Sequence, residues 1–488
     1  MTENSKIIEF NSLNHLNKEI ITDTLRKYLK VFNKENFYEN FSLIIFELIK
    51  NFYNFNLKRA FFQKNNINIT SFEDFKKFSS NFDKLLLQGK QQYKDIIKKE
   101  GYNIKLYFTL ENSDFVIIVE NILNTRLDFE KQEIINTFNF IKEYKYLDQA
   151  LQNDKNNILN YNLILAVLLL RKIGLDESYI RFFFDNNILK VKINFPLYKI
   201  NKVESINEDS IIEEILNEIK NIPQFPQHIV QALYTLNNPN SNFDDISYII
   251  KKDSALIADI LKLVNSSLYS LPKKVASIEE AVRIIGLKGL KNLIIAYSTN
   301  KIFMNKYNIN LIKKIMRHST EVAIYSYEIA KKFGLNSIID YVYVCGMLHD
   351  FGKIIINSIN PEIINKMEDI CRSKGIDLWT IESLSQGYNH SFIGFKLAEK
   401  WNFPDYLKDA ILLHHTPWYT NSENRTIVYT IYFANNLTYY RNKEIEYNDI
   451  SKEVLDFFNI PNKESIDLLL EEFYNIYNNF IESDTILI

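Results

Sequence analysis

The chain has 488 residues, of which 46% are hydrophobic and 14% aromatic, and this composition excludes a disordered protein because it offers enough apolar surface for packed cores. The formal net charge of −2 gives no basic surplus, so nucleic acid is not an expected partner. Two cysteines exclude a disulfide framework. No signal peptide or membrane-spanning run is recognisable, and we therefore expect a cytoplasmic protein.

Apolar spacing in the N-terminal half predicts helices interrupted by two pairs of strands. Residues 1–60 read as helices, and the β-rich runs IKLYFTL and FVIIVEN predict a hairpin after residue 103. Further helices are expected near 128–150 and 160–173, before a second hairpin around 185–187. Residues 1–200 are therefore predicted to form an α/β domain with an antiparallel sheet.

The C-terminal half is predicted to be a separate, all-α domain. A polar stretch at 201–209 is interpreted as a linker. From residue 210 to 484 the sequence shows amphipathic helices punctuated by prolines and no convincing strand. The chain is thus expected to be multidomain.

Histidines are concentrated in the C-terminal half. Five of the seven fall between residues 318 and 415, and an aspartate directly follows one of them. The residues are His318, His349, Asp350, His390, His414 and His415. Imidazole and carboxylate groups are the ligands of Zn, Mn and Fe in proteins, and such a metal can activate water for phosphoester hydrolysis. We expect a divalent metal here; a chance gathering of ordinary histidines is the alternative.

The motifs around these histidines resemble a known family. The segment CGMLHDFGKIII resembles the HD motif of HD-superfamily phosphohydrolases, and RHSTEVAIYSYEIAKKFGL resembles the helix that carries the first metal histidine, His318. NHSFIGFKLAEKWNFPDYLKDAILLHHTP is similar to a stretch typical of HDOD domains. The preceding segment also resembles that family, with matches at Asp253, Leu263 to Ser266 and Ile278 to Ala281.

This resemblance implies an HDOD domain over 210–484, with an HD-like helical subdomain at about 310–445. HDOD domains resemble hydrolases that have become regulatory binding modules. Asn265 and Ser266 are expected to cap or brace helices in it.

The sequence departs from the hydrolase pattern at the last metal ligand. HD hydrolases need a final Asp, and the matching position holds Asn435, whose neutral amide is a weaker ligand than a carboxylate. The Gly-Tyr-Pro element of cyclic-di-GMP phosphodiesterases is also absent. No catalytic residue is assigned. Lys353 is interpreted as a phosphate contact, with a solvated loop lysine as the alternative.

The N-terminal half resembles the GHKL ATPases. Glu47 and Asn51 lie four residues apart on one helical face, and a GHKL helix presents Glu and Asn in this way to orient water and hold Mg²⁺. The expected adenine-binding Asp is replaced by Glu120 or Asn121, and the lid segment DKNNILNYN lacks glycine. The resemblance implies a degenerate domain with a vestigial site and without ATP binding. An ordinary exposed helix face is the alternative for Glu47 and Asn51.

The leading hypothesis is a bacterial signal-transduction protein that acts as a binding scaffold through its HDOD domain. It would read a protein partner of a signalling pathway or a nucleotide second messenger. One alternative is a metal-dependent HD phosphohydrolase acting on a nucleotide, centred on His318, His349 and Asp350. Another is a nucleotide-sensing pseudokinase built on the N-terminal half.

Overall fold

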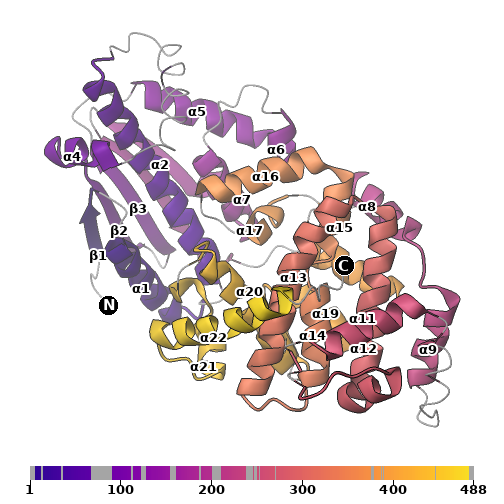
Figure 1. Ribbon diagram of the computed structural model, residues 1–488. Coiled ribbons are helices and arrows are strands. Elements are labelled where there is room, and N and C mark those ends of the chain that lie inside the picture. The colour runs from indigo at the N-terminus through magenta and orange to yellow at the C-terminus, as the bar shows by residue number, and fades with distance from the viewer. Residues whose placement is uncertain are drawn as a thin grey trace. The chain divides into compact units, whose positions relative to one another are not determined.

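Figure 1 shows the computed structural model of the chain, which divides into two compact units, Met1–Asn207 and Glu208–Ile488. Each unit is described by itself. The predicted linker 201–209 lies outside the described residues. The structure describes residues 6–11, 15–34, 37–67, 78, 91–111, 114–122, 128–153, 161–185, 188–200, 210–237, 246, 250–251, 253–266, 268–269, 271–374, 378–385, 387, 389–421, 423–445 and 447–482.

The N-terminal unit contains a five-stranded antiparallel sheet in the order β1-β2-β3-β5-β4. Both predicted hairpins are confirmed, since β2 pairs with β3 and β4 pairs with β5. Alternate residues of β5 are buried, as expected for a strand with one face in a core. The strands are β1 (Lys6–Phe10), β2 (Ile104–Glu111), β3 (Asp114–Ile122), β4 (Ile180–Asp185) and β5 (Ile188–Phe195).

The prediction of helices over the whole of residues 1–60 is wrong at its start. Lys6–Phe10 forms the edge strand β1, in which Ile8 lies opposite Leu106 of β2. A five-residue segment is too short for its apolar spacing to separate strand from helix. Its conformation is set by pairing with a strand about a hundred residues away.

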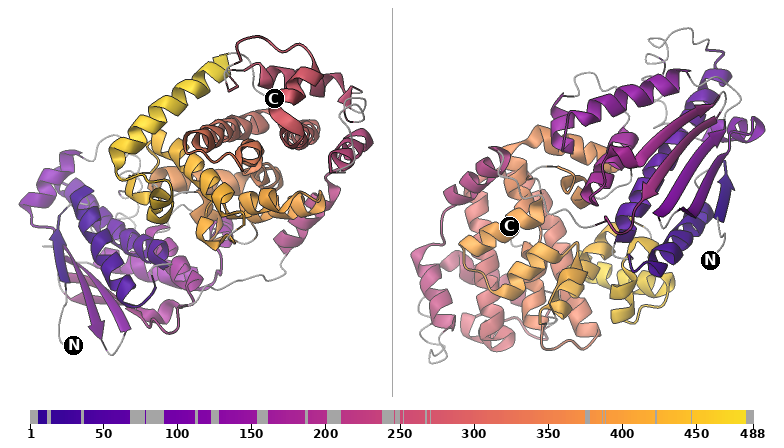
Figure 2. Two further views of the ribbon diagram at one scale, coloured as in Figure 1. Left: turned by 90° about the horizontal axis from the view of Figure 1, so that it is seen from below. Right: turned by 180° about the vertical axis from the view of Figure 1, so that it is seen from behind.

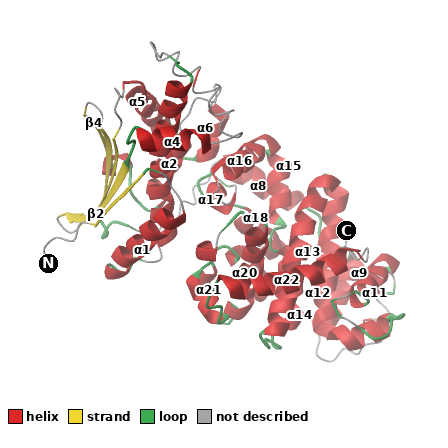
Figure 3. Ribbon diagram, turned by 60° about the vertical axis from the view of Figure 1, so that its left-hand side comes forward, coloured by secondary structure: helices red, strands yellow, loops and turns green. Residues whose placement is uncertain are grey.

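The helices of this unit lie against the sheet, and Figure 3 shows α1 and α2 on the same side of it. The predicted helix near 128–150 is two helices, α5 and α6. The most apolar helix, α7, is buried from Asn162 to Leu170 and packs on α2. The helices are α1 (His15–Val31), α2 (Tyr38–Lys64), α4 (Gln91–Lys99), α5 (Asp128–Lys142), α6 (Leu147–Asn153) and α7 (Tyr161–Lys172). None of the helices in the described part of the chain is both long and apolar enough to cross a membrane.

The C-terminal unit is helical, and its described residues contain no strand. Figure 2 shows these helices from two further sides. They are α8 (Ser210–Asn221), α9 (Gln227–Asn237), α11 (Ser254–Val264), α12 (Ile278–Lys306), α13 (Ile309–Lys332), α14 (Ile339–Leu348), α15 (Gly352–Ile359), α16 (Pro361–Lys374), α17 (Leu378–Glu382), α18 (His390–Lys400), α19 (Asp405–Leu413), α20 (Arg425–Arg441), α21 (Lys452–Phe457) and α22 (Lys463–Glu482).

The pair α13 and α14 forms the centre of this unit, and a glycine sets how closely the two helices approach. A Cβ atom on Gly346 would lie 2.5 Å from the Cα atom of Ala323, which real Cβ atoms do not tolerate. The absence of a side chain at Gly346 therefore lets α14 lie directly on the backbone of α13. This contact brings the end of α14, and His349 beyond it, toward His318 on α13.

The predicted bracing role of Asn265 and Ser266 is confirmed. The Asn265 amide donates to the carbonyls of Leu261 and Val275, and its oxygen accepts from the Val275 amide at 2.7 Å. Ser266 donates to the Leu263 carbonyl at 2.6 Å. These bonds fasten the end of α11 to the segment that leads into α12.

Candidate metal centre

The structure brings all seven predicted cluster residues together, from five helices of the C-terminal unit. One of them lies within α13 and one within α20, whereas the other five stand at helix ends, after α14, at the start of α18 and after α19. They are His318, His349, Asp350, His390, His414, His415 and Asn435. Helix ends are suitable positions for metal ligands because their backbone groups lack intrahelical partners and can hold a side chain in one orientation by a hydrogen bond.

Two of the histidines are oriented by the helix end that precedes them. His349 Nδ1 donates to the Gly346 carbonyl at 2.7 Å, and His414 Nδ1 donates to the Ile411 carbonyl at 2.8 Å. A carbonyl oxygen can only accept, so Nδ1 carries the proton in both rings. In the neutral ring this tautomer leaves a lone pair on Nε2, and that is the form of imidazole that binds metals.

His390 is held by a carboxylate that the sequence analysis did not identify. Its Nδ1 donates to Glu382 Oε2, and its backbone amide donates to the same oxygen at 3.1 Å. Burial lowers the pKa of His390, but the carboxylates of Glu382 and Asp350 together outweigh burial, and the pKa is raised. A carboxylate behind a histidine is the usual support of a metal ligand.

Asp350 lies between two groups of histidines. Its Oδ2 atom is 3.4 Å from His349 Nε2 and 3.5 Å from His318 Nε2. Its Oδ1 atom is 3.2 Å from His390 Nε2 and 3.5 Å from His414 Nε2. Each carboxylate oxygen thus faces a different group. We call His318, His349 and Asp350 the first group, and Asp350, His390, His414 and His415 the second group; within each, the ligand atoms lie within 4.8 Å of one another.

Several of these contacts bring nitrogen and oxygen ligand atoms close together. His349 Nε2 is buried without a hydrogen-bond partner, and it faces the Asp350 carboxylate. His390 Nε2 and His414 Nε2 lie 3.2 Å apart. Either a proton on His390, whose pKa is raised, or a metal ion can join two nitrogens at this distance. Nitrogen and carboxylate ligands in these numbers fit a divalent Zn, Mn or Fe ion.

Burial favours the neutral form of the other histidines. It lowers the pKa of both His318 and His414 to about 3, although the Asp350 carboxylate acts in the opposite direction. The pKa of His415 is also lowered, first by burial and then by the neighbouring histidines. Near neutral pH all three are unprotonated, as a metal ligand must be.

Asn435 lies beside the first group and offers it a neutral oxygen atom. It is fully buried on α20, and its Oδ1 atom lies 3.1 Å from His318 Nε2. The Asn435 Nδ2 atom has no hydrogen-bond partner. The first group therefore has a single carboxylate, which it shares with the second group.

Lys353 is not a solvated loop lysine, and that alternative is wrong. It lies in the first turn of α15 with 14% of its side chain exposed, and its Nζ atom is 2.6 Å from Asp350 Oδ2. Although burial lowers the pKa of Lys353, the negative charge of Asp350, with smaller contributions from Tyr439 and Glu382, outweighs burial and raises it. Lys353 thus neutralises part of the charge of Asp350.

A glycine also sets the distance between α18 and the segment after α14 that carries His349 and Asp350. A Cβ atom on Gly352 would lie 2.0 Å from the carbonyl oxygen of His390. This contact fixes the separation between Asp350 and His390, and therefore between the two ligand groups.

The candidate residues of the N-terminal unit are buried as well, so the alternative of an exposed helix face is wrong for Glu47 and Asn51. Glu47 accepts from Lys50 Nζ at 2.7 Å and from Asn162 Nδ2 at 2.8 Å, which links α2 to α7. At the position expected for an adenine-binding Asp, Asn121 donates to Asn56 Oδ1 at 3.0 Å. Glu47 and Asn121 are therefore each bonded to other side chains of the unit.

The comparisons with known proteins agree on the C-terminal unit. The family model described as the HDOD domain matches residues 222–417, so the chain carries an HDOD domain within this unit. An uncharacterised protein of Treponema pallidum (strain Nichols) is 26% identical over 425 residues, which cover 86% of this chain and 82% of that protein. This alignment is longer than the C-terminal unit, so it extends into the N-terminal unit.

Solved structures that are similar to part of the chain include the following two. An HDOD domain protein of unknown function from Geobacter sulfurreducens is 24% identical, with 56% of this chain and 88% of that chain covered and a TM-score of 0.43. A protein from Shewanella amazonensis SB2B, named only provisionally as a phosphohydrolase, is 23% identical, with 56% and 98% covered and a TM-score of 0.45.

Proposed function

We propose that the C-terminal unit is a metal-binding regulatory module of a signalling protein. The observation that carries this proposal is the position of Asp350 between two groups of histidines whose ligand atoms lie within 4.8 Å of one another in each group. The second group offers three imidazoles and a carboxylate, which is a full set of four protein ligands. Four protein ligands are typical of structural zinc sites, which leave no position for a substrate.

Elemental analysis of protein purified without chelator tests this proposal. We expect near-stoichiometric Zn, Mn or Fe in the wild type, and its loss in the double variant His349→Ala, Asp350→Ala. His228→Ala is the matched control, because His228 contacts Asp253 and lies outside the cluster. Absence of metal from the wild type, or equal metal in wild type and double variant, would overturn the proposal.

Phosphodiester hydrolysis is the second candidate function. A carboxylate shared by two ligand groups supports it, because two-metal hydrolases clamp the attacking and leaving oxygens between paired ions. Lys353 would then partly balance the charge of Asp350. Against it, Asn435 removes the second carboxylate from the first group, and so weakens the attraction for a second ion. Turnover of bis(p-nitrophenyl) phosphate with added Mn²⁺, lost in His349→Ala, would favour the hydrolase over the regulatory module.

The proposed scaffold acts on a signalling partner, either a protein or a nucleotide second messenger. Binding of a partner to the full chain, reduced by the double variant His349→Ala, Asp350→Ala, would support a role for the cluster in that interaction. Equal binding by the two proteins would place the partner elsewhere.

We further propose that the N-terminal unit is a degenerate GHKL-like domain that does not bind ATP. The order of helices and hairpins around one antiparallel sheet supports this proposal. Glu47 is fully buried, and both of its carboxylate oxygens already accept from internal partners, Lys50 and Asn162. We expect MgATP to leave the melting temperature unchanged, and a concentration-dependent rise would contradict the proposal.

A further inference from the structure

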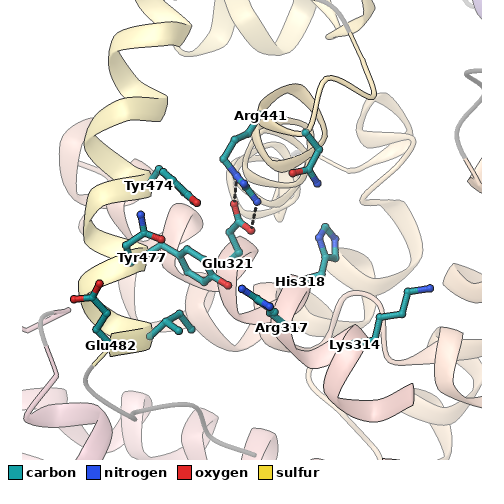
Figure 4. Close-up of a pocket in the computed structure, with 11 residues that line it drawn as sticks. Lys314, Arg317, His318, Glu321, Arg441, Tyr474, Tyr477 and Glu482 are labelled. Atoms are coloured by element: carbon teal, nitrogen blue, oxygen red, sulfur yellow. Dashed lines mark hydrogen bonds and ion pairs between the residues drawn. The ribbon is translucent and has the colours of Figure 1, made fainter. Parts of the chain in front are cut away.

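A pocket of about 310 Å³ opens beside the first ligand group, between α13, the end of α20, and α22 (Figure 4). His318 is the member of the metal-ligand cluster that lines this pocket, and 23% of its side chain is exposed. The walls from α20 and α22 lie beyond residue 417, outside the part of the chain that the HDOD family model matches.

The floor of the pocket carries two cations from α13. Arg317 is exposed, bonds to the Tyr477 hydroxyl, and forms no ion pair with any carboxylate in the described residues. Lys314, one turn earlier, lies 3.2 Å from both oxygens of Glu368. The Lys314 side chain is 69% exposed, and an ion pair so open to solvent is weak. Both cations are therefore available to bind an anion in the pocket.

The acidic residues of the pocket do not cancel this charge. Glu321 makes two bonds to Arg441, at 2.8 and 2.9 Å, so these two charges neutralise each other. Glu482 stands at the end of α22 and is exposed to solvent, where its charge is screened. The charge left to act on a ligand is positive.

An aromatic wall faces these cations. Tyr474 and Tyr477 project from α22 into the pocket, as Figure 4 shows. The Arg441 guanidinium lies 4.6 Å from the centre of the Tyr474 ring and holds it in place. A ring on one side and cations on the other suit a ligand that joins an anionic group to a planar ring.

We propose that this pocket binds a small organic phosphate ester, with its phosphate on Arg317 and Lys314 and its ring against Tyr474. Arginine and lysine together with the Tyr477 hydroxyl supply donors from several directions, which suits a tetrahedral dianion better than a planar carboxylate. The ligand lies next to His318 and does not need the metal, so the proposal stands apart from the proposed function.

Isothermal titration calorimetry of the full chain with phenyl phosphate tests the proposal. We expect saturable binding at one site per chain, weakened about tenfold or more by Arg317→Ala because a charge-assisted bond is lost. Lys313→Ala is the matched control, since Lys313 is an exposed cation on the same helix that does not line the pocket. It should change affinity by less than about twofold. Absence of binding, or equal binding by Arg317→Ala and wild type, would overturn the proposal.

Further ligands and variants separate the pocket from the metal centre. Benzoate should bind more weakly than phenyl phosphate, and equal binding would overturn the assignment of a phosphate. Tyr474→Leu should weaken the binding of phenyl phosphate but not the binding of inorganic phosphate, which has no ring. The double variant His349→Ala, Asp350→Ala should still bind phenyl phosphate. If the double variant does not bind it, and Arg317→Ala binds it as the wild type does, the phosphate binds the metal and not this pocket. Metal content measured on the same samples shows whether the proposed function fails independently.

Discussion

The two units each bury a cluster of polar side chains, but the clusters differ in how their hydrogen bonds are satisfied. In the N-terminal unit, both oxygens of Glu47 accept from donors on neighbouring groups, Lys50 and Asn162. In the C-terminal unit, His349 Nε2 is buried without a donor or acceptor partner and faces the carboxylate of Asp350.

This difference separates a structural role from a binding role. Buried polar groups normally find hydrogen-bond partners, and a carboxylate such as Glu47, whose two oxygens both accept hydrogen bonds, needs no added ion. A buried cluster of a carboxylate and several imidazoles needs a proton or a metal ion to offset its charge and join its ligand atoms. The Glu47 cluster therefore braces two helices, whereas the Asp350 cluster is suited to a metal ion.

Removing a ligand of the second group should have the largest effect. His414→Ala takes away one of three imidazoles whose lone pairs converge beside Asp350, and we expect most of the bound metal to be lost. Elemental analysis measures the loss. Full metal content in this variant would show that the lone pairs do not converge on an ion, and the contrast between the two clusters would fail.

A methyl group at the contact between the two ligand groups should destabilise the C-terminal unit. Gly352→Ala places a Cβ atom 2.0 Å from the His390 carbonyl oxygen, and the forced shift should cost about 3 kcal/mol. Thermal unfolding followed by circular dichroism measures it. Gly289→Ala is the control, because its Cβ atom would meet only the Ile285 side chain at 3.3 Å, and its effect should stay within about 1 kcal/mol.

Breaking the N-terminal cluster should affect stability but not metal binding. Glu47→Ala leaves Asn162 Nδ2 without its acceptor, which should cost about 1–3 kcal/mol. Chemical denaturation measures this cost. Glu111→Ala removes a more exposed partner of Lys192 and should change stability by less than about 0.5 kcal/mol. A loss of metal in Glu47→Ala would show that the two clusters are not independent.

Restoring a carboxylate to the first group should have the smallest effect. Asn435→Asp adds a negative charge beside His318, and we expect tighter binding of an ion there, on the order of tenfold. Competition with a chromogenic chelator measures the affinity. Unchanged affinity would mean that Asn435 Oδ1 does not face the ion.

The helices and hairpins of both units were largely predictable, because their apolar spacing is a local property. The two hairpins and the buried helix α7 appear where alternation and apolar runs predict them. The edge strand β1 and the burial of Glu47 were not predictable. Each depends on a partner about a hundred residues away, β2 and Asn162 respectively, and apolar spacing says nothing about such partners.

The sequence by itself determined which seven residues form the cluster and how two of its histidines are oriented. His349 and His414 each bond to a carbonyl three residues earlier, so a few consecutive residues specify their geometry. Only the tertiary structure decided that Asp350 lies between two groups, that Lys353 pairs with it, and that Glu382 supports His390. These arrangements depend on how closely separate helices pack, which glycines such as Gly352 permit and which no local pattern encodes.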